Sequence, residues 1–492
     1  MHTLLGLDIG SSSVKASLVN VTTGETLATA QSPAEEMPMH AAAPGWAEQH
    51  PDMWWEHVVK SVRACLKKLN EKTEVRAIGI SYQMHGLVVV DKAGRPLRPS
   101  IIWCDSRAVD IGNKANAALG TEYCLKHFLN SPGNFTASKL RWVKENERDV
   151  FKNIAHIMLP GDYIAYKLSG EINTTDTGLS EGIFWDYPAG EVSGKLLDHY
   201  GFDKELIAPM VPVFSVQGTL HKEAAAELGL DPGVKIAYRA GDQPNNAFSL
   251  NVLNPGETAA TAGTSGVIYS VTDQNAFDPK SRVNTFIHVN NKKQNIRNGV
   301  LLCVNGTGIL NSWLRKTWKG MGAAYEYDQM NALAAEVPVG ADGLILLPFG
   351  NGAERILENK DINASFHGLN FNRHGQAHLL RAAQEGIVFA LRYGFDILQS
   401  MGIKTNVIRA GNANMFLSPI FREAFVNTIG ARLELYDTDG SKGAALGAGI
   451  GSGIYSSFTE AFKGLRLIKA EEPANTMKEQ YAEAYEKWKS YL

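Results

Sequence analysis

Short apolar runs alternate along the chain with longer segments of helical period. The first two runs, residues 4–9 and 14–19, flank a polar Gly-Ser-Ser-Ser tip at 10–13, which predicts a β-hairpin. A second pair of apolar runs within 258–271 flanks Gly-Thr-Ser-Gly at 263–266 in the same way. The two tips align without a gap about half a chain length apart. This repeat favours an internal duplication, and therefore two equivalent domains.

Helical periods fill the stretches between these runs. From Asp52, a residue type that caps helices, apolar side chains recur at i, i+3 and i+4 as far as Leu69. A second helix is predicted from about His378 to Met401, where Gly402 ends it. The strands predicted between such helices are 75–80, 234–240 and 343–347. This alternation indicates mixed α/β layers.

The length of the chain predicts two domains. Its 492 residues exceed what one hydrophobic core usually serves, so two domains of roughly 250 residues each are expected. We place the boundary near 241–255, which divides the chain into 1–245 and 246–492. No low-complexity linker marks this boundary, and that suits a structured hinge. A ligand is expected in the cleft between two such domains.

Composition and charge exclude several classes of partner. An apolar fraction of 44%, a charged fraction of 20% and a formal net charge of -3 are those of a soluble globular protein without a basic stripe for nucleic acid. No stretch reaches the ~18 consecutive apolar residues of a membrane span, and the N-terminus lacks a signal sequence. The four cysteines show no Cys-x-x-Cys spacing, which is typical of reduced thiols. We therefore expect a cytoplasmic protein with no nucleic-acid or membrane partner, and its oligomeric state, a homodimer included, stays open.

The two Gly-rich tips are candidate phosphate-binding loops. Main-chain N–H groups and hydroxyls at 10–13 could hold phosphate oxygens without the lysine of a P-loop, whose Gly-x-x-x-x-Gly-Lys-Ser/Thr pattern does not occur in the chain. A plain hairpin turn stays an equal alternative for each tip. A matched pair of tips at one cleft favours phosphate binding.

Two carboxylates stand within or directly after apolar strands. Asp8 lies in the first apolar run, where it needs a hydrated cation or a hydrogen bond to the turn as its partner. Asp242 follows Gly241 at the carboxyl end of the strand 234–240, the end at which open α/β sheets bind ligands. Asp242 could take the proton of an attacking hydroxyl in phosphoryl transfer, or it could simply form an Asx turn.

Two further segments offer polar groups near strand ends. Ser-Tyr-Gln-Met-His-Gly at 81–86 follows the strand 75–80 and could read the hydroxyls of a sugar, with its histidine as a hydrogen-bonding group more than as a base. Trp-Cys-Asp-Ser-Arg at 103–107 could orient a substrate, but an internal ion pair between Asp105 and Arg107 is favoured.

Taken in order, these motifs resemble the FGGY carbohydrate kinases, and within them the xylulokinases, over essentially the whole chain. The resemblance covers both tips, Gln-Met-His-Gly at 83–86, Gly-Asp at 241–242 and the run that begins with His-Gly-Leu at 367–369. It implies an α/β fold of duplicated actin-like (ribonuclease H-like) ATPase domains that flank a central cleft. It also implies transfer of the γ-phosphate of Mg-ATP to the terminal hydroxyl of a ketose, with D-xylulose the leading substrate.

The same resemblance implies roles for individual residues. Asp242 is the expected catalytic base, and Asp8 and Asp242 are the carboxylates expected at Mg²⁺ and the phosphates. The residues expected to bind the sugar are Met84, His85, Gly86, Trp103, Asp242 and Gln243. The residues expected to bind ATP are Gly10, Ser11, Ser12, Lys15, Gly263, Thr264, Ser265, Gly411 and Asn412.

Three segments depart from the family pattern and keep alternatives open. They are Gln-Pro-Asn-Asn at 243–246, Ala-Gly-Asn-Ala-Asn at 410–414 and Gly-Asn-Gly-Ala-Glu-Arg at 350–355. The first leaves L-ribulose, L-fuculose and gluconate open as substrates, and the other two leave open a sugar-binding regulator without catalysis. An actin-like or chaperone-type ATPase would not require a sugar-reading Met-His-Gly. The chain also ends in a single amphipathic helix, with Tyr481, Tyr485 and Trp488, and not in a peptide-binding appendage.

Overall fold

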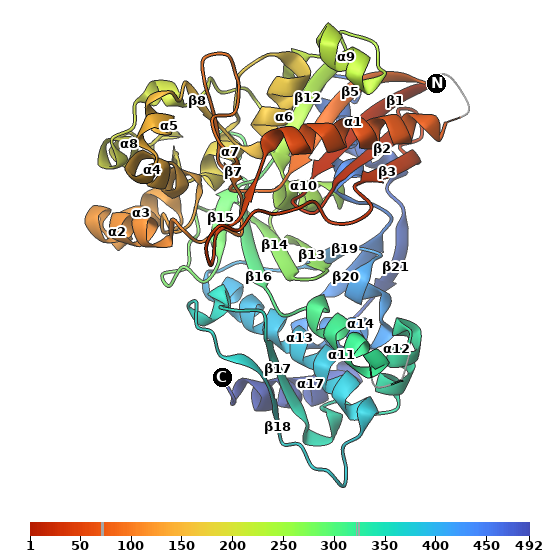
Figure 1. Cartoon of the computed structure of the whole chain (residues 1–492). Coiled ribbons are helices and arrows are strands. Elements are labelled where there is room, and N and C mark those ends of the chain that lie inside the picture. The colour runs from red at the N-terminus through yellow and green to blue at the C-terminus, as the bar shows by residue number, and fades with distance from the viewer. Residues whose placement is uncertain (70–72, 321, 323–324) are drawn as a thin grey trace. The chain divides into compact units, whose positions relative to one another are not determined.

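The computed structural model describes residues 1–69, 73–320, 322 and 325–492, which form two compact units (Figure 1). Unit 1 comprises Met1–Asn251, Phe286–Asn298 and Thr438–Leu465. Unit 2 comprises Val252–Thr285, Gly299–Asp437 and Arg466–Leu492.

The two sequence halves are distributed differently between the units. The first half, 1–245, lies wholly in unit 1, whereas parts of the second half, 246–492, belong to each unit. The reason is that helix α15 (Gly440–Gly451), although late in the chain, packs on the sheet of unit 1.

Unit 1 is built on a mixed sheet with the strand order β11, β12, β5, β1, β2, β3. These strands span Phe214–Thr219 (β11), Lys235–Gly241 (β12), Glu74–Tyr82 (β5), His2–Ile9 (β1), Val14–Asn20 (β2) and Thr26–Ser32 (β3). β1, β2 and β3 form an antiparallel meander, while β5 and β12 run parallel to β1. The carboxyl ends of β1, β5 and β12 therefore meet at one edge of the sheet.

The second sheet has the strand order β15, β16, β14, β13, β19, β20, β21, in which β15 (Asn284–Ile287) is an added edge strand and the other six repeat the arrangement of the first sheet. These strands span Asn298–Val304 (β16), Gly266–Thr272 (β14), Glu257–Ala262 (β13), Val407–Gly411 (β19), Arg432–Tyr436 (β20) and Leu467–Glu471 (β21). β13 and β14 form the second hairpin, β19 and β20 run parallel to β13, and β21 is antiparallel to β20 as β11 is to β12. Equivalent strands in the same order confirm the α/β class and the internal duplication predicted from the sequence.

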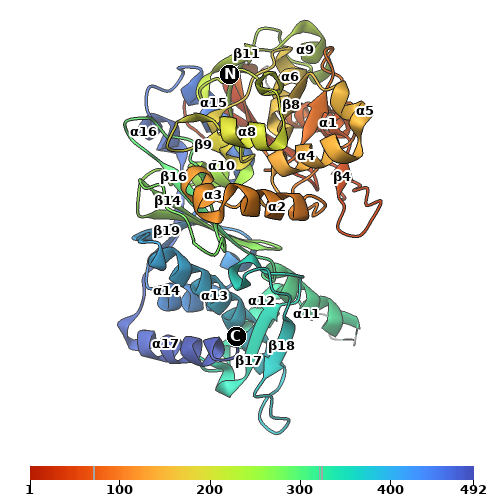
Figure 2. The same ribbon diagram turned by 90° about the vertical axis from the view of Figure 1, so that its left-hand side faces the viewer.

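Helices cover both sheets. Besides α15, those of unit 1 include α1 (Pro51–Lys67), α4 (Thr136–Asn146), α6 (Pro160–Ser169), α7 (Asp176–Glu181) and α10 (Asp242–Ser249). Those of unit 2 include α11 (Gly308–Gly320), α12 (Tyr327–Ala335), α13 (Gln376–Ser400), α14 (Pro419–Ile429) and α17 (Asn475–Lys489). α13, α14 and α17 pack together (Figure 2), and α17 buries Tyr481, Tyr485 and Trp488 as its amphipathic pattern predicts. Within the described parts of the chain, no helix is both long and apolar enough to cross a membrane.

Some predicted boundaries are wrong by a few residues. The N-cap of α1 is His50 and not Asp52, because Pro51 has the backbone angle of a first helical residue and the His50 Nδ1 accepts the Asp52 N–H at 3.3 Å. The strand predicted at 343–347 is β17 (Ile345–Phe349), because a 3₁₀ turn at Ala341–Gly343 precedes it.

Backbone atoms of α15 approach β1 and β5 very closely. A Cβ atom on Gly6 would lie 1.7 Å from the main-chain oxygen of Ser441, and one on Gly79 would lie 1.9 Å from that of Ala444. Both positions therefore require glycine for the approach of another backbone.

Gly79→Ala is expected to lower the free energy of unfolding by about 1–3 kcal/mol, because the added methyl group must displace α15 from the sheet. Urea unfolding of the purified protein measures this change. Gly194→Ala is the matched control, since a Cβ there meets no atom within 4 Å. Equal stability of the two variants would contradict the close approach.

Candidate active site

Asp8 stands next to the last residue of β1 and faces two other elements of unit 1. Its Oδ1 accepts a 2.8 Å hydrogen bond from the Ser81 hydroxyl of β5, and its Oδ2 lies 2.5 Å from the place of a Cβ on Gly440, the first residue of α15. Burial raises the pKa of Asp8 and nearby Asp439 raises it further, while Ser81 and Lys15 act in the opposite direction. The strand end and the helix start thus hold a carboxylate that resists ionisation.

Asp439 and Lys15 form an ion pair beside Asp8. The Lys15 Nζ lies 2.5 Å from the Asp439 Oδ2, and the Asp439 Oδ1 caps α15 by accepting the main-chain N–H of Lys442 at 2.9 Å. Burial opposes ionisation of Asp439, but Lys15 and the hydrogen bonds outweigh it and the pKa is lowered. Lys15 therefore balances the charge of the ionised Asp439 carboxylate. Asp439 was not among the site residues predicted from the sequence.

Asp242 is the first residue of α10 and directly follows β12. Gly241 pairs with Tyr82 in the parallel ladder, which places Asp242 at the same sheet edge as the end of β5. Burial raises the pKa of Asp242 to about 7, and the charge of Asp8 contributes to this, while the side chain and main-chain N–H of Gln243 hydrogen-bond the carboxylate and act against it. Asp8 and Asp242 therefore form an electrostatically coupled pair of carboxylates.

The segment predicted to read a sugar lies beside Asp242. Met84 is buried, and its Cγ lies 2.6 Å from the place of a Cβ on Gly241, so glycine is needed before Asp242. A Cβ on Gly86 would lie 2.6 Å from the ring of Pro160, the first residue of α6. The segment 84–86 is thus closely packed, with Met84 against Gly241 and Gly86 against Pro160.

The first Gly-rich tip lies against Trp103. The Gly10 N–H donates to the Ser13 carbonyl at 3.0 Å, and Met37 N–H donates to the Ser12 carbonyl at 2.8 Å. The indole N–H of Trp103, half exposed, donates to the Ser11 hydroxyl at 3.3 Å. A residue expected at the sugar therefore touches one expected at the phosphates.

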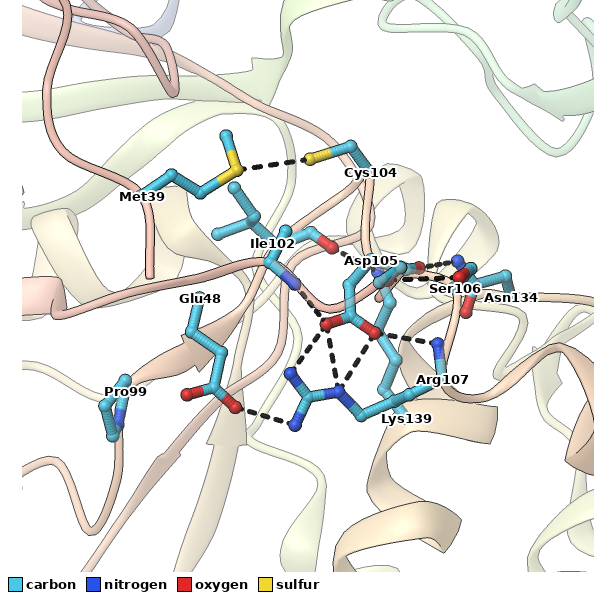
Figure 3. Close-up of polar contacts among 12 residues, drawn as sticks. Met39, Glu48, Pro99, Ile102, Cys104, Asp105, Ser106, Arg107, Asn134 and Lys139 are labelled. Atoms are coloured by element: carbon cyan, nitrogen blue, oxygen red, sulfur yellow. Dashed lines mark hydrogen bonds and ion pairs between the residues drawn. The ribbon is translucent and has the colours of Figure 1, made fainter. Parts of the chain in front are cut away.

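The favoured ion pair in the segment 103–107 is confirmed (Figure 3). The side chains of Asp105 and Arg107 are buried, and the guanidinium donates to both carboxylate oxygens, at 2.6 Å in the closest contact. The Arg107 Nη1 lies 2.6 Å from Glu48, and the guanidinium stacks on Trp46 and Trp142. Asp105 and Arg107 therefore have structural roles, whereas Trp103 of the same segment lies next to the first Gly-rich tip.

The second Gly-rich tip borders a cavity of about 580 Å³ within unit 2. Gly263 and Thr264 line it, and their carbonyls accept the N–H groups of Gly308 and Ile309 at 2.8 and 3.2 Å, which joins the tip to the N-terminus of α11. The polar residues that line the cavity besides these are Asn311, Ser312, Lys316, Asp328, Asn331, Asn414 and Ser418. The amide side chains and the one lysine of this lining supply hydrogen-bond donors and a positive charge, which suit a phosphate-bearing ligand.

Of the five residues of unit 2 that are expected to bind ATP, three lie outside the lining of this cavity. Ser265 interacts with Cys303, Gly411 ends β19, and the Asn412 N–H donates to the Tyr436 carbonyl at 3.0 Å. Asn414 lines the cavity in their place. The Asn-Gly-Thr-Gly run at 305–308, which opens α11, was the signal in the sequence that could have found this wall.

Three features define an actin-like ATPase fold equipped for phosphoryl transfer. The two units repeat one strand order, each has a Gly-rich hairpin tip, and unit 1 holds a pair of coupled carboxylates. Residues 3–249 match the N-terminal domain of the FGGY family of carbohydrate kinases, and residues 258–450 match its C-terminal domain. The chain belongs to the FGGY family of carbohydrate kinases and is an ATP-dependent sugar kinase.

Curated relatives and solved structures agree with this assignment. Xylulose kinase of Escherichia coli is 28% identical over 90% of this chain and 88% of its own length, and xylulose kinase of Bacillus subtilis is 28% identical over 94% and 90%. The crystal structure of xylulose kinase from Rhodospirillum rubrum superposes with a TM-score of 0.87 at 26% identity, covering 99% of this chain and 98% of that one. Gluconate kinase from Lactobacillus acidophilus shares the fold at 23% identity, with a TM-score of 0.88 and coverage of 100% and 97%.

Proposed function

We propose that this kinase transfers the γ-phosphate of Mg-ATP to the terminal hydroxyl of D-xylulose and forms D-xylulose 5-phosphate, with Asp242 as the general base. The observation that carries the base is the position of Asp242 at the end of β12, beside Met84 and with a pKa raised to about 7. The relatives named xylulose kinase, which align over about nine-tenths of the chain, support the substrate.

Asp242 would take the proton of the sugar hydroxyl as the hydroxyl attacks the phosphorus atom. A base works best when its pKa lies near the operating pH, and burial together with Asp8 brings Asp242 to that range. Gln243, which hydrogen-bonds the carboxylate, would orient it. The departure from the family pattern at 243 thus still supplies a side chain that can hold the base.

Asp8 and Asp242 suit a magnesium ion, because Mg²⁺ binds through one or two carboxylates and completes its shell with water and substrate phosphates. When bound, Mg²⁺ neutralises charge on the transferring phosphoryl group. The residues proposed at the sugar are Met84, His85, Gly86, Trp103 and Gln243, and those proposed at ATP are the first tip and the cavity beside Gly263 and Thr264.

Steady-state phosphorylation of a substrate panel tests the sugar. We expect kcat/KM for D-xylulose to exceed that for L-ribulose, L-fuculose and gluconate by about tenfold or more, the discrimination that one well-placed polar contact provides. A preference for any of the other three would reject the proposed substrate and leave the kinase activity in place.

The cavity of unit 2 gives a separate test of ATP binding. A Cβ on Gly308 would lie 2.3 Å from the Gly263 carbonyl oxygen, so Gly308→Ala is expected to push the tip aside and raise KM for ATP about tenfold, with KM for the sugar within about twofold. Gly320→Ala, at the other end of α11, is the control because a Cβ there meets no atom within 4 Å. An unchanged KM for ATP in Gly308→Ala would place the nucleotide elsewhere.

A further inference from the structure

His85 has a backbone conformation that its surroundings must impose. Its φ angle is 60°, in the left-handed region that residues other than glycine seldom adopt. Such a conformation is strained and persists only where neighbouring groups hold it. Two buried residues from different helices, Glu181 and Lys139, supply contacts that can hold the turn.

Glu181, the last residue of α7, binds His85 at two points. Burial raises the pKa of the Glu181 carboxyl well above its ordinary value, while the main-chain N–H of His85 is close enough to act in the opposite direction; the Glu181 main-chain carbonyl lies 2.9 Å from the His85 Nδ1. A carbonyl oxygen can only accept a hydrogen bond, so Nδ1 carries the hydrogen. In the neutral ring, any hydrogen bond that Nε2 makes is therefore one that it accepts.

Lys139 holds the other side of the same turn. This residue of α4 is fully buried, and its Nζ donates to the His85 and Ile102 carbonyls at 2.9 Å each. Ile102 directly precedes Trp103, and Figure 3 shows Lys139 beside Ile102 and the Asp105–Arg107 pair. Burial lowers the pKa of Lys139 to about 7, and both forms of the amine can donate two hydrogen bonds.

The His85 ring is also fixed by packing. Its centroid lies 4.8 Å from that of Phe135 in an edge-on contact and 5.2 Å from that of Phe286. Residues of unit 1 thus lie against His85 at its backbone N–H, at its carbonyl, at the ring Nδ1 and beside the ring.

We infer that Glu181 and Lys139 are positioning residues of the sugar site, which together fix His85 as the Nδ1–H tautomer and make its Nε2 a hydrogen-bond acceptor. The inference rests on the proposed function in so far as His85 contacts the sugar. A hydroxyl group can donate to such a nitrogen, whereas a carboxylate cannot. The arrangement therefore favours a neutral polyhydroxylated sugar over a sugar acid at this position.

The tautomer is measured directly on the unmodified enzyme. We label the protein with ¹⁵N-histidine, record ring ¹⁵N–¹H correlation spectra at pH 8, where an ordinary histidine is neutral, and assign His85 by the signals that disappear in His85→Gln. The expected result is a protonated Nδ1 and an unprotonated Nε2. The opposite tautomer would overturn the inference without any reference to activity.

Kinetics test the two positioning residues. Lys139→Met and Glu181→Ala are each expected to raise KM for the sugar about tenfold or more, the effect of leaving a buried polar group of the turn without its hydrogen-bond partner, while KM for ATP stays within about twofold. Glu181→Gln keeps an oxygen that accepts the His85 N–H and is expected to restore the sugar KM to within about threefold.

Lys144→Met is the matched control for Lys139. Lys144 lies on the same helix and its Nζ also donates to two carbonyls, those of Tyr200 and Gly201, but neither belongs to the sugar segment. Equal effects in the two lysine variants, or equal rises in both Michaelis constants, would overturn the positioning role. Should another ketose prove to be the substrate, the proposed function would fail while the tautomer and the selective rise in that sugar's KM would still support this inference.

Discussion

Asp242→Asn is expected to lower kcat by about 10²- to 10⁴-fold while the affinity for the sugar changes by no more than a few-fold. The amide has the same size as the carboxylate and can still hydrogen-bond a hydroxyl, so binding survives. It cannot accept the proton that the sugar hydroxyl loses during attack. The variant therefore removes one chemical step and keeps the shape of the site.

The environment of Asp242 explains why this carboxylate, among several, would have the largest effect. It stands at the start of α10, and burial together with Asp8 raises its pKa to about 7. Asp439, by contrast, has a lowered pKa and is engaged with Lys15, which makes it a poor proton acceptor. A single carboxylate in this group thus combines a suitable basicity with a place beside the sugar segment.

Calorimetric titration with the sugar and steady-state kinetics measure the two quantities separately. Asp176→Asn is the control, because Asp176 is also a partly buried aspartate at the first position of its helix, α7, and burial raises its pKa as well. It is expected to keep kcat within about threefold, the ordinary effect of a change outside the reacting groups. Near-normal turnover in Asp242→Asn would show that another group takes the proton.

Arg107→Met is expected to lower the free energy of unfolding by about 3–5 kcal/mol, because it leaves the fully buried carboxylate of Asp105 without its cation. The loss also removes the contact with Glu48 and the stacking between Trp46 and Trp142. Methionine fills much of the volume of the arginine stem, so the effect reports mainly on the charge.

Urea unfolding monitored by fluorescence and circular dichroism measures this change. Arg95→Met is the matched control: Arg95 also pairs with an aspartate, Asp91, but its side chain is 79% exposed, so its loss is expected to cost less than about 1 kcal/mol. Equal losses in the two variants would show that burial of the Asp105–Arg107 pair contributes nothing to its strength.

Local patterns were sufficient to predict several of the strands and turns of this fold. The Gly-rich tips at 10–13 and 263–266, the strand before Asp242 and the Asp105–Arg107 pair all depend on residues close together in the sequence. Backbone preferences and hydrophobic periods act over such distances. These features can therefore be predicted without a structure.

Contacts between distant segments were not predictable in the same way. Lys15 and Asp439 are 424 residues apart, and nothing in either local sequence indicates the other. Asn414 rather than Asn412 lines the cavity because the chain turns away after β19. Glu181 meets His85 through helix packing, and only the structure shows that meeting.

The contribution of α15 to unit 1 has a consequence for biosynthesis. A ribosome synthesises the first 251 residues long before it reaches Gly440. The face of β1 and β5 around Gly6 and Gly79 therefore stays uncovered by α15 until translation is nearly complete. Synthesis of unit 1 thus begins first, but its folding can be completed only after α15 has been made. A fragment that stops near residue 249, where the match to the N-terminal family domain ends, would leave the ribosome with that face exposed to chaperones and to other nascent chains.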